Sequence, residues 1–101
     1  PFRMIKEHGK IQVAAEKNGR SVIFDLKVFE RKVRKTRKLF AETQCPDANH
    51  FIIQFFVKDA DSVEEIIQRF CKQLAHRGFE PVRLRFLKRG WGPWEALTGA
   101  E

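Results

Sequence analysis

Apolar and polar residues alternate over residues 11–16 and again over residues 22–28. A period of two is typical of a strand that buries one face. The two runs are separated by Lys17-Asn18-Gly19-Arg20, and Asn-Gly is a strong hairpin signal because both turn positions need a positive φ. The sequence therefore predicts an antiparallel β-hairpin over residues 11–28.

A second hairpin is expected further along the chain. Residues 31–38 contain six basic residues, and the apolar run 39–43 follows with no proline or glycine between. The simplest interpretation is a longer hairpin whose two arms are strands and whose basic tip projects into solvent. A helix across residues 27–40 is the alternative, because Lys and Arg favour helices while the Val, Thr and Phe of this segment do not.

The middle of the chain reads as a loop followed by a strand. Residues 45–49 contain Pro46, Asp47 and Asn49, which favour turns. Residues 51–58 are then apolar on both alternating faces. A strand with two apolar faces is typical of the interior of a sheet, so this strand is predicted to be central.

One amphipathic helix is predicted over residues 63–77. Ser62 and Glu65 have the spacing of a capping box, in which each side chain accepts a hydrogen bond from an unpaired amide at the helix start. Gly78 is suited to the left-handed position that ends a helix. The residues with helical spacing that form the apolar stripe are Val63, Ile66, Ile67, Phe70, Cys71 and Leu74.

The last strand is expected over residues 82–88, opened by Pro81, with Arg83 and Arg85 pointing outward. A strand, helix and strand in succession imply a right-handed crossover, which places strands 51–58 and 82–88 parallel in one sheet. Residues 90–97 are rich in turn formers, and a short edge strand is possible there.

These elements define the expected fold. It is an α+β fold in β-β-β-β-α-β order, with a mixed, mainly antiparallel sheet of four to six strands and one main helix packed on one face. The 101 residues, 43% hydrophobic and 33% charged, suit one globular domain over residues 1–101.

The cysteines and the hydropathy pattern bear on location. Cys71 falls on the apolar stripe of the helix, where a free thiol is the commoner state, so neither it nor Cys45 is expected in a disulfide. We therefore expect a reducing intracellular compartment, cytoplasmic or nuclear. No apolar run approaches the ~20 residues of a membrane span, and no export signal is recognisable.

Charge is the strongest indication of function. The chain has 20 Lys and Arg against 13 Asp and Glu, a formal net charge of +7, and residues 27–38 supply nearly all of it. Like charges at this density repel one another unless an anion lies between them. A nucleic acid, RNA or DNA, is the expected partner, although a solvated loop is the alternative. The candidate contact residues are Arg31, Lys32, Arg34, Lys35, Arg37, Lys38, Arg83, Arg85, Lys88 and Arg89, with Phe40 as a stacking platform.

Trp91 and Trp94 have more than one interpretation. They could stack on bases beside Arg89, anchor a protein partner as tryptophans often do at interfaces, or cover one end of the core. The protein-interaction module is therefore the first alternative to nucleic-acid binding.

Evidence for catalysis or a bound metal is thin. Cys45 and His50, and Cys71 and His76, share a spacing of five, but residues five apart on a helix point ~140° from each other, so no metal site is expected. His8, His50 and His76 leave a metal-independent ribonuclease as a second alternative. No phosphate-cradling glycine loop or Ser/His/Asp set is present, so no catalytic residues and no cofactor are predicted.

Overall fold

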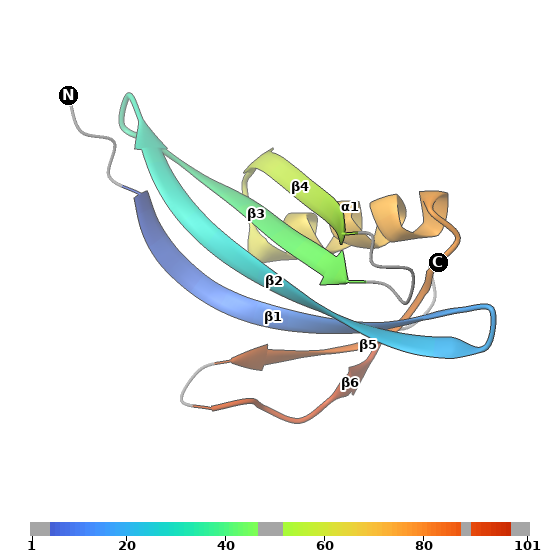
Figure 1. The fold of residues 1–101 in the computed structure, drawn as a ribbon. Coiled ribbons are helices and arrows are strands. Elements are labelled where there is room, and N and C mark those ends of the chain that lie inside the picture. Colours follow the sequence, from blue (N-terminus) through green and yellow to red (C-terminus); the bar gives the residue numbers. More distant parts are fainter. Residues whose placement is uncertain (1–4, 47–51, 88–89, 98–101) are drawn as a thin grey trace.

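The computed structural model describes residues 5–46, 52–87 and 90–97. Its six strands form one sheet in the order β4-β3-β2-β1-β5-β6, and every neighbouring pair is antiparallel. A single helix packs on one face of this curved sheet (Figure 1). The predicted α+β fold and its element order are confirmed. The elements are β1 (Ile5–Lys17), β2 (Arg20–Val33), β3 (Thr36–Pro46), β4 (Ile52–Ala60), α1 (Val63–His76), β5 (Glu80–Leu87) and β6 (Glu95–Ala96).

The first hairpin forms as predicted. Asn18 and Gly19 have φ values of 53° and 77°, as a two-residue turn with left-handed central residues requires. β1 is longer than the alternation indicated, because pairing continues past a bulge between Glu7 and Gly9 to Ile5.

The second hairpin is also present, and the alternative of a helix across residues 27–40 is wrong. β2 pairs with β3 from Lys27 opposite Glu42 to Val33 opposite Thr36. Cross-strand contacts between β-branched and aromatic residues favour this pairing over helix formation. The turn is formed by Arg34 and Lys35, whose φ values of 51° and 68° are left-handed.

Helix α1 lies on the concave side of the sheet (Figure 1). Ser62 is its N-cap, and the Ser62 hydroxyl accepts a hydrogen bond from the Glu65 amide at 3.1 Å. The Glu65 carboxylate accepts from the amide of Asp61 at 3.0 Å. Arg77 is the C-cap and Gly78 follows with a φ of 84°, so the predicted helix bounds hold to within one residue.

The core lies between α1 and the sheet. Ile66, Phe70 and Leu74 are the buried members of the predicted stripe. Phe70 meets Phe24 and Phe55 edge to face, at centroid distances of 5.8 and 5.5 Å. Edge-to-face packing suits the ring quadrupoles, so much of the chain's phenylalanine goes to the core, as its composition suggests.

The prediction that the fourth strand is central is wrong, because β4 is an edge strand. One of its faces packs against α1, but Phe56 on the other face is 47% exposed. Helix side chains cover the unpaired edge: Gln73 Nε2 donates to the Phe56 carbonyl and Arg69 to the Lys58 carbonyl, each at 2.6 Å. Two apolar faces therefore do not show that a strand has a neighbouring strand on each side.

Strands β4 and β5 run in the same direction, as the crossover predicted, but they are not neighbours. Strands β3, β2 and β1 lie between them, so the β4-α1-β5 connection spans most of the sheet. The predicted loop at residues 45–49 is shorter at its start, since Cys45 and Pro46 belong to β3, and residues 47–49 lie outside the described residues. The short edge strand expected within residues 90–97 is β6, paired with Arg83 and Leu84.

Cys71 is a half-buried free thiol on α1, and burial raises the pKa of this thiol. The side chain of Cys45 lies outside the described part of the structure. Over residues 5–46, 52–87 and 90–97, no helix combines the length and apolar character needed to cross a lipid bilayer.

Candidate nucleic-acid interface

The basic tip, defined as Arg31–Lys38, is the end of the β2–β3 hairpin. Among the described residues, pairing of β2 with β1 reaches Arg31, and pairing of β3 with β4 reaches Leu39. Within this part of the chain the residues between them pair with one another, and the hairpin end projects beyond β4 and α1 (Figure 1). This geometry matches the projecting basic hairpin that the sequence predicted.

Half of the six predicted basic residues at the tip have acidic partners within the chain. Arg31 and Arg37 lie 3.7 Å from the carboxylates of Asp59 and Glu30 respectively. Lys38 donates to Asp61 at 2.6 Å, and this hydrogen bond raises the pKa of Lys38 and lowers the pKa of Asp61. Their charge is thus partly offset internally.

The other half are Lys32, Arg34 and Lys35. All three side chains are exposed, and within the described residues none of them has an ion pair or hydrogen bond. Lys32 lies directly opposite Arg37 across the hairpin, an arrangement of like charges that is unfavourable in the free protein. Uncompensated positive charge is therefore concentrated at the extreme end of the hairpin.

The turn at the tip differs in chemistry from the turn at the other end of β2. Both have two central residues with left-handed φ, but one uses Asn18-Gly19 and the other Arg34-Lys35. For a residue other than glycine this conformation costs roughly 1–2 kcal/mol, and asparagine is less affected than most. The chain thus places two long cations where turn chemistry alone favours Asn-Gly. No local sequence pattern indicated that Arg34 and Lys35 form the turn.

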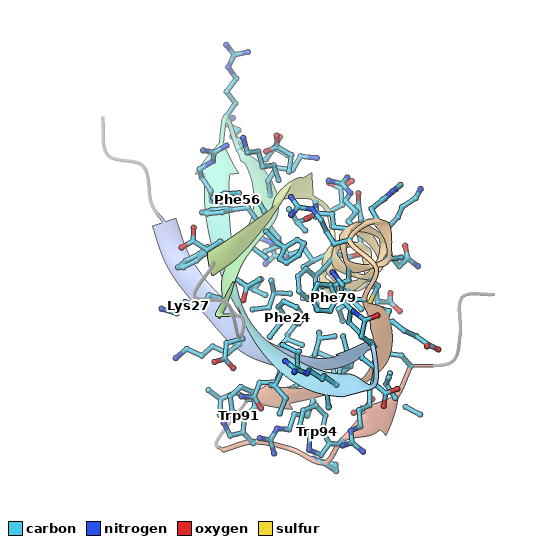
Figure 2. The ribbon with its side chains drawn as sticks, turned by 45° about the vertical axis from the view of Figure 1, so that its right-hand side comes forward. Phe24, Lys27, Phe56, Phe79, Trp91 and Trp94 are labelled. Carbon is cyan, nitrogen blue, oxygen red and sulfur yellow. The ribbon has the colours of Figure 1, made fainter. Side chains whose placement is uncertain are left out.

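Phe40 lies on the outer face, which is the face of the sheet that α1 leaves uncovered. It is half-buried and stacks on Phe29 at a centroid distance of 5.2 Å and an interplanar angle of 22°. The Arg31 guanidinium lies 5.9 Å from the Phe40 ring. Phe56 is exposed on the same face (Figure 2). Phe40 is thus outside the main core and beside the basic tip.

Arg83 and Arg85 point to the outer face, as the alternation predicted, and they contact both tryptophans. Arg85 lies 4.5 Å from the Trp94 ring and 5.0 Å from the Trp91 ring, and Arg83 lies 5.3 Å from Trp94. Trp91 is 38% exposed and Trp94 is half-buried. The two groups that the sequence treated separately, arginines and tryptophans, form one cluster over β5 (Figure 2).

This cluster and the basic tip do not form one patch: Arg31 and Lys38 of the tip lie on the outer face, whereas Lys32 and Arg37 alternate to the opposite face. Arg85 is opposite Gln12 on β1, which is opposite Asp25 on β2. Asp25 precedes Arg34 by nine residues, which at about 3.3 Å per residue corresponds to about 30 Å along β2. The predicted residues Lys88 and Arg89 lie outside the described residues.

Two basic residues that sequence reasoning did not select lie between these groups. Lys10 and Lys27 are directly opposite each other on β1 and β2, and neither has an ion pair within the described residues. The Asn18-Gly19 turn fixes the register of this hairpin, so the pairing of the two lysines was implicit in the sequence.

The residues considered for a metal or for catalysis are only partly described. His76 is exposed at the end of α1, and the side chains of His8 and His50 lie outside the described residues. Among the residues described, no three His, Cys, Asp or Glu side chains are grouped closely enough to hold a metal ion.

Comparison with known proteins adds no relative. No protein-family model matches the chain, and no curated protein or solved structure is significantly similar to it.

Proposed function

We propose that this chain is a nucleic-acid-binding module whose basic hairpin tip contacts backbone phosphates and which carries out no turnover. The observation that supports the proposal most directly is the exposure of Lys32, Arg34 and Lys35 without acidic partners among the described residues. Lys and Arg dominate phosphate contacts, and such contacts position a protein without reading sequence. A smaller contribution to phosphate binding comes from Arg31, Arg37 and Lys38, because these residues already have acidic partners.

Salt-dependent binding tests this proposal. The double variant R34N/K35G gives the tip the same turn residues as the Asn18-Gly19 hairpin, so the hairpin should keep its fold while losing two charges. Binding of labelled RNA and DNA is measured by fluorescence anisotropy from about 50 to about 200 mM salt. Because each phosphate contact on a duplex contributes about 0.9 to the logarithmic salt slope, the double variant should flatten the slope by about two units.

The matched control is R20Q/K72Q, which also removes two exposed positive charges but leaves the tip intact. Both double variants have the same net charge, so a difference between them reports the position of the charges. Equal losses in the two variants would mean that only net charge matters, and an absence of binding by the wild type would refute the proposal.

The same assay separates the two alternatives. A protein-interaction module anchored by Trp91 and Trp94 would bind no nucleic acid, and stacking of Arg83 and Arg85 on these rings leaves little of Trp94 for a partner. A ribonuclease would shorten the labelled RNA during incubation, so the integrity of the RNA is examined on a denaturing gel.

A further inference from the structure

The cluster of arginines and tryptophans on β5 holds one guanidinium in a fixed position. Arg85 lies against both Trp91 and Trp94, and its Nε donates to Gln12 Oε1 at 2.8 Å. Gln12 in turn donates to Asp25 at 2.7 Å, so the orientation of Arg85 is coupled to three adjacent strands. Within the described residues no acceptor contacts the two terminal nitrogens of Arg85. A guanidinium fixed in this way, with its terminal donors available, suits a phosphate.

Lys10 and Lys27 lie between this cluster and the basic tip. They are opposite each other on adjacent strands, and Glu42 on β3 lies opposite Lys27 on its other side, so this row keeps a net positive charge. Lys27 precedes Arg34 by seven residues, or about 23 Å along β2. Positive charge is therefore available at three places: the tip at the end of the hairpin, and this lysine pair and Arg85 on the outer face.

Aromatic side chains accompany this charge. The stacked Phe29 and Phe40 lie between the lysine pair and the tip, and the exposed Phe56 lies on β4 one strand away. Single-stranded nucleic acids bind grooves and faces that combine cations for the backbone with aromatic rings for the bases. Duplex phosphates can use the cations but not the rings.

The curvature of the sheet distinguishes further between single and double strands. The sheet curves toward α1, so the outer face is convex (Figure 1). A DNA duplex is stiff over about 150 base pairs and would touch a convex face over only a short segment. A single strand is flexible enough to follow the face for the about 30 Å between the tip and Arg85.

We propose that the ligand is a single-stranded nucleic acid that runs along the outer face from the basic tip, past Lys10 and Lys27, to Arg85, where Trp91 and Trp94 position the guanidinium for a phosphate. This inference rests on the proposed function and names its substrate class and path.

Intrinsic fluorescence provides a local test, since the chain has two tryptophans and both contact Arg85. Oligothymidylates of about 4 to about 16 nucleotides, spanning common single-strand site sizes, are compared with a duplex of the longest length. The shortest oligonucleotide should bind at the tip without changing tryptophan emission. Longer oligonucleotides should bind more tightly and quench the tryptophan emission. The duplex should bind less tightly than the single strand of the same length and quench the emission less.

Two variants locate the path. R85Q should weaken binding of the longest oligonucleotide about tenfold, as expected for loss of a charged hydrogen bond, and leave the shortest unaffected. K27Q should weaken the longest about threefold, and because Lys27 is exposed and has no ion pair among the described residues, its loss should leave folding unchanged. R20Q, outside the outer face, is the control with the same net charge as K27Q.

The outcomes separate this inference from the proposed function. Equal binding of single strand and duplex, independent of length and without tryptophan quenching, would overturn the path while leaving binding at the tip intact. Equal binding of the longest oligonucleotide by K27Q and R20Q would also overturn the path and leave binding at the tip intact. If no nucleic acid binds at any length, the proposed function fails as well.

Discussion

At the scale of residues, the two turns that flank β2 show a conflict between residue type and backbone conformation at one end of the strand. Asn18-Gly19 has the residue types that a left-handed turn favours, whereas Arg34-Lys35 adopts the same backbone at a cost. Strained residues concentrate at functional sites, and here the strained pair is also exposed and cationic. This cost is consistent with a binding role for the tip, because it has no evident benefit for the fold.

This conflict predicts that R34N/K35G is more stable than the wild type. Relief of left-handed strain should raise the free energy of unfolding by about 1 kcal/mol, or the thermal midpoint by about 4–8 °C for a domain of this size. Differential scanning calorimetry measures the shift. The reciprocal change N18R/G19K should lower the midpoint, since Gly19 has no close neighbours and only its backbone conformation matters there. A lower midpoint for R34N/K35G would contradict the argument.

At the scale of elements, α1 has two roles. Its apolar stripe closes the core, and its polar side chains cover the free edge of β4 through Arg69 and Gln73. An uncovered edge strand is a template for pairing with another chain. The helix therefore protects the strand that sequence alone placed in the interior.

The variant R69A/Q73A should expose this edge. We expect self-association that increases with protein concentration, measured by analytical ultracentrifugation, together with a modest loss of stability from the two unpaired carbonyls. The control Q68A/K72A changes two exposed positions of the same helix and should remain monomeric. A monomeric R69A/Q73A would show that the edge is protected by other means.

At the scale of the whole molecule, positive charges face one another in three rows of the sheet, two of them adjacent at the tip. Lys10 is opposite Lys27, Arg31 is opposite Lys38, and Lys32 is opposite Arg37. The ion pairs of Arg31, Arg37 and Lys38 involve exposed or partly exposed groups, and such pairs contribute little. Repulsion should therefore dominate the electrostatics of the free protein.

The predicted consequence is that salt stabilises this protein. The thermal midpoint should rise between about 10 and about 100 mM sodium chloride, as the screening length falls from about 30 to about 10 Å. R34N/K35G should show a smaller rise because it lacks two of the repelling charges. A midpoint that falls with salt would mean that the ion pairs at the tip outweigh the repulsion.

The sequence by itself determined the local elements of this protein. Asn18-Gly19, the capping residues Ser62 and Glu65, and the outward direction of Arg83 and Arg85 were all predicted correctly. Turns, caps and strand faces depend on residues a few positions apart, so their patterns can be read directly from the chain.

Only the tertiary structure decided how these elements combine into the candidate site. It placed β4 at an edge, brought Asp59 and Asp61 to Arg31 and Lys38, and set Arg85 against the tryptophans. The two ion pairs join residues more than 20 positions apart, and the Arg85 contacts depend on how residues 90–97 fold back over β5, so none of them follows from a local pattern. For that reason the basic stretch could be predicted, whereas the residues at its end that lack acidic partners in the described part of the chain could not.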